Sequence, residues 1–410
     1  MYDAVVSTDE KKGDYLLPSQ AFGAGALNVF VRRGVYNEES DVVLPPGATL
    51  TGEHRGLTII DFGGNGASVR VESGFLAVET AGTVEVQSGS PNVVGTGTTF
   101  TNIAAGDTII LFDNDFIVQT ITDDENLVLE GPYNGRSAAG VTFSALQMRA
   151  YDQLKNFTIR NSTSVGLNLS GCRRFLVENV TISKCTPNLN LDQCVQSVMR
   201  NVVGEFSLGV GMAINACHSM TYSMVTMLSA VSHGMAITAE CANVLFHDVD
   251  TTCNGASGAY INGVFHDSNF TNCAMRQNYE HGVYANSSAY SFVLNSSNVD
   301  FNGITGMESH GQRTICTNST FKNNVTYGID MSGDYSIFGQ NIGFNNDNGI
   351  RCSASRCNIN DNSMINNAND CCMTTNGADN NIVSGNHFEG AGVTPFDDSG
   401  SNTTSTSNKP

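Results

Sequence analysis

The chain has 410 residues, of which only 14% are charged, and its formal net charge is −19 with 20 Lys and Arg residues. This length exceeds a typical compact core and fits a solenoid or several domains. A surface this acidic repels nucleic acid and anionic membranes, so neither is expected as a partner. Apolar residues still recur regularly, which is not typical of a disordered chain.

The sequence also bears on the compartment. No run of about 18 apolar residues is present, so no membrane span is expected. The first residues lack a basic segment followed by an apolar one, so no secretory signal peptide is expected, and the predicted location is virion or extracellular. The 12 Cys residues show no paired CxxC pattern, so no metal site is expected. Most are predicted to be core hydrophobes, with one or two disulfides as the alternative.

Residues 1–78 are predicted to form an N-terminal cap and the first coils of a solenoid. Short apolar strands occur at Val29–Tyr36, Asp41–Glu53 and Leu57–Asp61. The order of a Gly-x-Tyr strand end, a Pro-Gly turn and a Leu-x-Gly-Glu strand resembles the first coils of the pectate-lyase-like β-helix superfamily. That resemblance implies a right-handed parallel β-helix, in a superfamily of lyases, hydrolases, epimerases and non-enzymes. Residues 14–25 are predicted to form a short helix over the open end of the core.

Residues 79–145 depart from this pattern and are predicted to form a small inserted β-barrel or sandwich. Short alternating strands are joined by Gly, Asp and Asn turns. The stretch from Gly95 to Phe100, followed by Gly106-Asp-Thr-Ile, resembles a module that recurs in tail-fibre and other virion appendage proteins. The resemblance implies a role on a virus particle.

Residues 146–392 carry a repeat that predicts the main parallel β-helix. A Gly precedes a short apolar-alternating strand at intervals of 21 to 24 residues. The markers are Gly211, Gly234, Gly258, Gly282, Gly306, Gly328 and Gly349, with Cys371 continuing the series. Each interval is one coil, and equivalent residues of successive coils stack about 4.8 Å apart. A leucine-rich horseshoe is excluded because its Leu-x-x-Leu-x-Leu frame is missing.

Two features of the coils have predicted roles. Four residues before each of the last six markers stands an Asn, which predicts one internal ladder made of Asn254, Asn278, Asn302, Asn324, Asn345 and Asn367. The marker Gly is expected to supply a positive φ in the turn. The first and third residues after it should point inward, and the second and fourth outward. Residues 393–410 are rich in Ser, Thr, Asn and Gly and are predicted to be a disordered tail.

When the coils are projected onto one another, aromatic and ionisable side chains gather on one outward stripe. They stand just before, two after or four after the marker Gly. The members are Tyr260, His281, Tyr284, Glu308, His310, Tyr327, Asp330 and Arg351. Elsewhere the coil surface is mostly Asn, Ser and Thr. The alternative, that such residues decorate any outer face, stays open at this point.

These side chains suggest carbohydrate chemistry. Glu308 and Asp330 occupy the same position on adjacent coils, so one carboxyl is a candidate general acid while the other ionises. His310 is a candidate base or orienting group. The candidate binding residues are Tyr260 and Tyr284, expected to stack on sugar faces, together with His281, Tyr327 and Arg351.

The stripe also resembles the alginate C5-epimerases and related lyases, which carry Tyr-Gly-x-Asp-x-His. Here Gly306 to His310 and Tyr327 to Asp330 split that pattern over two coils, with Thr305 in place of the Tyr and Ser309 in place of the Pro. No cofactor is expected. A divalent cation such as calcium is expected only with a polyanionic substrate.

The sequence leaves three functions open. The favoured one is a virion-associated spike, fibre or capsid-surface β-helix that contacts a host polysaccharide or glycoprotein glycan, with or without residual glycan-processing activity. The second is a secreted glycoside hydrolase, polysaccharide lyase or epimerase. The third is a structural particle component without a ligand. Expected partners are glycan, other particle proteins and, because trimers are common among β-helix spikes, two further copies of the chain.

Overall fold

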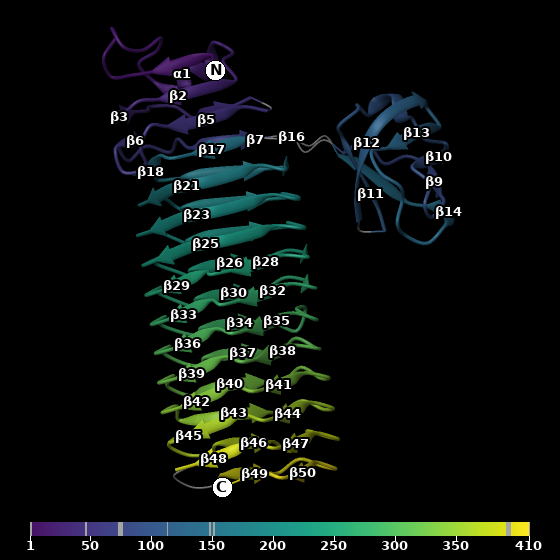
Figure 1. Ribbon diagram of the computed structural model, residues 1–410, viewed down its shortest axis with the longest axis vertical. Coiled ribbons are helices and arrows are strands. Elements are labelled where there is room, and N and C mark those ends of the chain that lie inside the picture. Colours follow the sequence, from purple (N-terminus) through teal and green to yellow (C-terminus); the bar gives the residue numbers. More distant parts are fainter. Residues whose placement is uncertain are drawn as a thin grey trace.

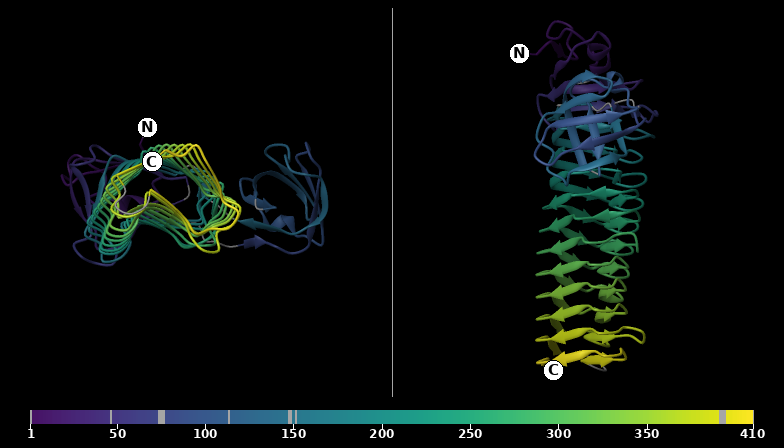
Figure 2. Two further views of the ribbon diagram at one scale, coloured as in Figure 1. Left: turned by 90° about the horizontal axis from the view of Figure 1, so that it is seen from below. Right: turned by 90° about the vertical axis from the view of Figure 1, so that its right-hand side faces the viewer.

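The computed structural model describes residues 2–45, 47–72, 77–112, 114–146, 149–150, 152–390 and 395–409. Parallel strands stack along one axis from the N-terminal to the C-terminal end, and a smaller unit stands beside the stack (Figure 1). In the view along the axis the coils superimpose on one another (Figure 2). The predicted parallel β-helix is therefore confirmed. No helix in the described parts of the chain is long and apolar enough to cross a membrane.

The strands that open with the marker Gly form a thirteen-stranded parallel sheet, here called sheet 1. Ten of its strands lie between Leu167 and Thr374, which agrees with the repeat. Its members are β4 (Val42–Leu44), β7 (Val69–Glu72), β19 (Leu167–Ser170), β22 (Leu189–Asp192), β24 (Met212–Asn215), β26 (Met235–Ile237), β30 (Ala259–Ile261), β34 (Val283–Ala285), β37 (Met307–Ser309), β40 (Tyr327–Met331), β43 (Asn348–Cys352), β46 (Cys372–Thr374) and β49 (Phe396–Asp398).

The rest of each coil forms two further faces. In three successive coils one eight-residue strand crosses both faces: β21 (Leu176–Ser183), β23 (Val198–Glu205) and β25 (Thr221–Leu228). From then on each coil has two three-residue strands here, beginning with β28 (Leu245–His247) and β29 (Asp250–Thr252). The stack ends with β47 (Ile382–Ser384), β48 (His387–Glu389) and β50 (Thr404–Thr406).

The chain turns between faces through residues with a positive φ, and these are seldom Gly. One such turn recurs at Asn179, Asn201, Asn272 and Asn318, all with φ between 52° and 57°. Asn, Asp and Ser tolerate this left-handed conformation better than other non-glycine residues, which accounts for their abundance in the sequence.

The marker glycines have a different role from the one predicted, because none of them has a positive φ. A Cβ on Gly282 would lie 2.6 Å from the carbonyl oxygen of Gly306 and 2.9 Å from Nδ2 of Asn302. The same crowding against the next coil recurs along the column. At these seven markers Gly is favoured because the backbone passes so close to the next coil that an added Cβ would overlap it.

An internal ladder of Asn side chains runs beside the markers, as predicted, with one correction. Asn254, Asn278, Asn302, Asn324, Asn346 and Asn367 are joined by hydrogen bonds from coil to coil. Asn345 was the predicted member, but it is exposed at a positive-φ turn, and Asn346 takes its place. That coil has one residue fewer between its Asn and its Gly, so counting back from Gly349 selects the wrong neighbour.

The apolar core is continuous along the axis, and the cysteines belong to it. All twelve Cys are free and eleven of them are buried, the exception being Cys253. Within one stacked column, Sγ of Cys217 accepts from the backbone N–H of Cys194, and Sγ of Cys241 accepts from that of Cys217. The expectation of core thiols is confirmed.

The ends of the solenoid fit one prediction and correct another. Helix α1 (Pro18–Gly23) buries Ala21 and Phe22 against the first coils, where a capping helix was expected. The predicted disordered tail is wrong for its described part, because β49 and β50 continue the parallel stack. A second internal ladder, made of Asn341, Asn362, Asn386 and Asn408, extends into this tail. Residues 391–394 lie outside the described range.

The unit beside the solenoid is an eight-stranded antiparallel sheet. It has its own apolar core, separate from that of the coils. These separate cores are the reason to propose residues 79–145 as a unit of its own. Its elements are β8 (Ala77–Glu79), β9 (Thr83–Val86), β10 (Asn92–Thr96), η1 (Phe100–Asn102), β11 (Thr108–Leu111), β12 (Asn114–Asp123), β13 (Asn126–Leu129), β14 (Ala138–Val141) and β15 (Phe143–Leu146).

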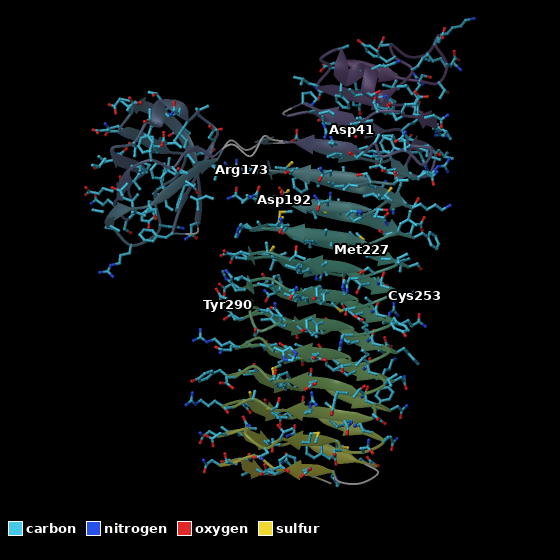
Figure 3. The ribbon with its side chains drawn as sticks, turned by 180° about the vertical axis from the view of Figure 1, so that it is seen from behind. Asp41, Arg173, Asp192, Met227, Cys253 and Tyr290 are labelled. Atoms are coloured by element: carbon cyan, nitrogen blue, oxygen red, sulfur yellow. The ribbon has the colours of Figure 1, made fainter. Side chains whose placement is uncertain are left out.

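The inserted unit meets the solenoid at one edge. Glu130 lies 3.6 Å from the guanidinium of Arg174, and the buried Arg173 lies on the same side (Figure 3). Cys253 is at the opposite edge (Figure 3). The candidate residues of the stripe lie several coils further along the axis.

Candidate functional site

The candidate site is the outer face of sheet 1 from β26 to β43. In each of these strands the residues on either side of the candidate position are buried in the core, which fixes the candidate side chain outward. Register partners are Ala236 with Tyr260, Tyr260 with Tyr284, Tyr284 with Glu308, Glu308 with Asp330, and Asp330 with Arg351. The structure therefore brings the predicted stripe together in one column.

At one end of the column, aromatic rings stack on one another. The centroids of His233 and Tyr260 are 4.2 Å apart, and those of Tyr260 and Tyr284 are 5.3 Å apart, both pairs being nearly parallel. The two faces of Tyr260 are therefore covered by rings, and one face of Tyr284 is covered. Tyr260 cannot stack on a sugar face as expected, so the stack presents ring edges to the outside.

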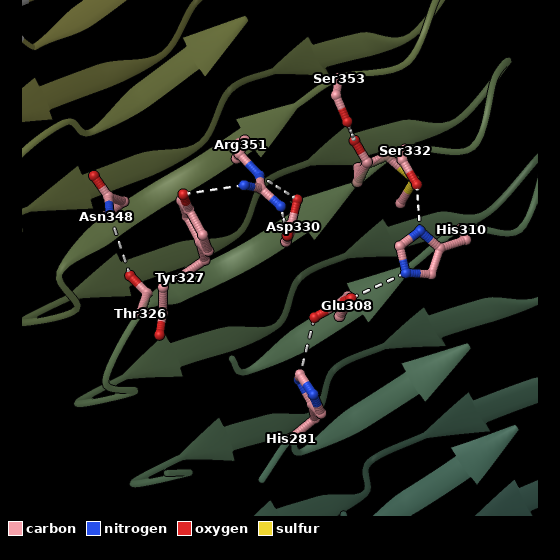
Figure 4. Close-up of polar contacts among 11 residues, drawn as sticks. His281, Glu308, His310, Thr326, Tyr327, Asp330, Ser332, Asn348, Arg351 and Ser353 are labelled. Atoms are coloured by element: carbon pink, nitrogen blue, oxygen red, sulfur yellow. Dashed lines mark hydrogen bonds and ion pairs between the residues drawn. The ribbon is translucent and has the colours of Figure 1, made fainter. Parts of the chain in front are cut away.

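In the middle of the column, Glu308 lies between two imidazoles (Figure 4). Its Oε1 is 2.9 Å from Nε2 of His310, and its Oε2 is 3.5 Å from Nδ1 of His281. Nδ1 of His310 also contacts the hydroxyl of Ser332. An ionised carboxylate can only accept, so in that state Glu308 accepts a hydrogen bond from Nε2 of His310. Both nitrogens of His310 are thereby held in place.

At the other end, Arg351 forms a two-pronged ion pair with the buried carboxylate of Asp330. Nε of Arg351 donates to Oδ1 of Asp330 at 2.7 Å, and a second guanidinium nitrogen donates to Oδ2. The same guanidinium lies 4.4 Å from the ring centre of Tyr327 and donates to its hydroxyl at 3.2 Å. Asp330 is 4% exposed, so it positions Arg351 and is poorly placed to touch a ligand.

Burial dominates the electrostatics of this face. It raises the pKa of Asp330 although Arg351 opposes the shift, and it raises the pKa of Tyr284 with help from the charge of Glu308. Burial lowers the pKa of His281 and of His233, which keeps both imidazoles uncharged near neutral pH. The bond to Asp330 is the main cause that raises the pKa of Arg351.

These shifts predict how stability depends on pH. Below the ordinary imidazole pKa of about 6.5, the unfolded chain takes up protons that buried His281 and His233 do not take up when folded. The free energy of unfolding should therefore fall as the pH is lowered from about 7 toward 5. Asp330 has the opposite effect on the free energy of unfolding. The stability that comes from its raised pKa is lost as the pH rises through that pKa. Denaturant titrations of wild type and His281→Gln should show a shallower fall in the variant, and equal slopes would contradict the prediction.

Sequence reasoning missed Glu280, and it placed Ser332 on this face without giving it a role. Glu280 contacts the hydroxyl of Ser257 and influences both His233 and His281. Ser332 holds His310. Glu280 stands two residues before a marker Gly, a position the projection did not include, and a projection of every turn residue would have found it. No group of three or more His, Cys, Asp or Glu able to hold a metal ion occurs among the described residues.

Comparisons with known proteins agree with this fold. A model described as right handed β-helix region matches residues 144–297, so the coils are those of a right-handed parallel β-helix. No curated protein sequence matches the chain. The A-module of mannuronan C-5 epimerase AlgE6 from Azotobacter vinelandii is similar with a TM-score of 0.56 and 13% identity, over 95% of this chain and 93% of that one.

Bacteriophage proteins are similar to the same degree. The tailspike gp61 of Pseudomonas phage phi297 has a TM-score of 0.51 and 12% identity, over 92% of this chain and 74% of that one. The tailspike gp49 of Pseudomonas phage LKA1 has a TM-score of 0.52 and 13% identity, over 94% of this chain and 73% of that one. At such identities these comparisons show a shared fold.

Proposed function

We propose that this chain binds an extracellular polysaccharide along the outer face of sheet 1, as a spike, fibre or surface protein of a virus particle. The observation that carries the proposal is the unbroken column from His233 to Arg351. It spans six strands of sheet 1, or roughly 24 Å at about 4.8 Å per coil. Ring edges, hydroxyls, a carboxylate and a guanidinium follow one another along this face. An extended polar polymer fits such a linear array.

The particle role is supported by two likenesses. The tailspikes named above share the fold over most of this chain. The inserted unit has the alternating short strands that resemble virion appendage modules. Neighbouring particle proteins and a homotrimer belong to the same proposal. Finding the chain by mass spectrometry in purified particles would support this role, and its absence there would contradict it.

The binding proposal predicts a loss of affinity when the exposed end of the ring stack is removed. Tyr284→Ala should weaken binding to any glycan that the wild-type protein binds on a glycan array by about tenfold or more. The reason is that a half-buried aromatic side chain is lost from the centre of the column. Tyr290→Ala is the matched control: Tyr290 also stacks on an imidazole, that of His266 at 4.9 Å, but it lies outside the site sheet. Equal effects of both variants, or no hit on the whole array, would contradict the proposal.

A second candidate function is carbohydrate processing, which the contacts of Glu308 with two imidazoles favour. Proton transfer needs a carboxyl and an imidazole within hydrogen-bond reach, and Glu308 and His310 meet that condition. Asp330 is occupied by Arg351, so the predicted carboxyl pair reduces to Glu308 with His310 as the acid and base.

The test of this second candidate is incubation of wild type and Glu308→Gln with a panel of polysaccharides. Single replacement is preferable because Asp330→Asn would also disturb Arg351. New reducing ends from wild type alone, at a rate at least about a hundredfold above the variant, are the expected sign of hydrolysis. Ultraviolet-absorbing ends from wild type alone would indicate a lyase. Product from neither protein would leave binding as the function.

A further inference from the structure

We infer that the sugar held beside Glu308 carries a free amino group, bound as an ammonium, and that the site discriminates against carboxylated sugars. This inference rests on the proposed polysaccharide binding and names its substrate class. It follows from the charge of the face and from the unfilled hydrogen-bonding capacity of Glu308.

The outer face of sheet 1 is negatively charged around the candidate site, as the whole chain is. Glu280, Glu308 and Asp330 lie on or beside strands β34 to β40, and Arg351 is the one Lys or Arg in the strands of sheet 1 from β26 to β43, all of which are described. Both oxygens of Asp330 engage that guanidinium. The charge of Arg351 is therefore balanced within the protein and is not available to a uronate.

The buried imidazoles of His233 and His281 do not cancel this charge. Burial lowers the pKa of His233 and His281, so neither adds a positive charge near neutral pH. The groups facing His281 are Glu280, Glu308, Asp330 and His310. A carboxylate brought to this point would meet Glu308 at close range, where like charges repel strongly because water is partly excluded.

One carboxylate oxygen of Glu308 is available to accept a hydrogen bond from a ligand. One oxygen accepts from His310, while the other faces Nδ1 of His281 at 3.5 Å, and that buried nitrogen has no hydrogen-bond partner. The Glu308 side chain is 21% exposed, so a ligand can reach it. Tyr284 is its register partner on the preceding coil. An ammonium can therefore donate a charge-assisted hydrogen bond to Glu308.

The experiment compares three oligosaccharides of equal length and linkage: oligoglucosamine with free amines, its N-acetylated form and the corresponding oligouronate. Calorimetry at low salt should rank affinity in that order, with at least about a tenfold difference between the first and the last. Added salt should shrink the difference. Glu308→Gln should bring the amine and N-acetyl forms to within about twofold of one another. Asp361→Asn removes an exposed charge outside the strands of sheet 1 and should leave the order unchanged.

Each outcome decides the question. Equal affinities, or tightest binding of the oligouronate, would overturn the inference and leave glycan binding intact. If Asp361→Asn reduced the preference for the amine as much as Glu308→Gln does, the preference would come from the net charge of the protein. That result would also overturn the inference. Binding of none of the three overturns the inference, whereas only failure of the entire glycan array overturns the proposed function.

Discussion

Asn302→Ala should cost about 3–5 kcal/mol of unfolding free energy, the largest effect expected for a single polar residue in this protein. Oδ1 of Asn302 accepts from the backbone N–H of Asn278 at 3.2 Å and from its Nδ2 at 3.0 Å. Nδ2 of Asn302 donates to Asn324 and to the carbonyl of Met275. Alanine would leave two buried donors of Asn278 without an acceptor, each at a cost of about 1–3 kcal/mol.

A matched control exists on the outside of the same coils. Asn262 is also a ladder residue, accepting from Nδ2 of Asn286 at 2.9 Å, but it is exposed, so water replaces the lost bond. Asn262→Ala should change stability by less than about 0.5 kcal/mol. Asn302→Asp, which keeps the shape but loses the donors, should be nearly as damaging as Asn302→Ala at neutral pH. Denaturant unfolding measures all three, and similar values for Asn302→Ala and Asn262→Ala would show that burial of the ladder contributes nothing.

The second large effect is expected at the marker glycines. Gly282→Ala should destabilise the solenoid by about 3 kcal/mol, because the new methyl group would overlap backbone that cannot withdraw. The Cβ would stand 2.6 Å from the carbonyl oxygen of Gly306 and 2.3 Å from Cγ1 of Val299. Separating the coils to relieve the clash would lengthen the interstrand hydrogen bonds of sheet 1 on both sides.

Gly56→Ala is the control of opposite sign. The nearest atoms to its added Cβ belong to the flexible side chain of His54 at 3.9 Å, and its φ is not in the left-handed region. Such a replacement should be neutral or stabilise by about 0.4–1 kcal/mol, since it restricts the unfolded chain. If Gly282→Ala behaved like Gly56→Ala in thermal and denaturant unfolding, close coil packing would not be the reason for the marker glycines.

The sequence by itself determined the coil register, and with it the neighbours of the candidate site. Because each coil contributes one strand to sheet 1, a constant offset from the marker Gly is enough to place Glu308 beside Asp330 and Tyr260 beside Tyr284. The inward and outward alternation follows from the two-residue period of a strand. The buried Cys residues and the internal Asn ladder were also predictable, because residues at the same position of successive coils stack on one another and share one environment.

Tertiary structure alone decided what these neighbours do. The position of a residue relative to the marker Gly does not give its side-chain rotamer. The sequence therefore could not predict that Arg351 binds Asp330, that rings cover Tyr260 or that Glu308 lies between two imidazoles. Offsets also fail where a coil changes length, as at Asn346. The role of the marker Gly depends on the distance between adjacent coils, which is set by interstrand hydrogen bonds and not by the local sequence.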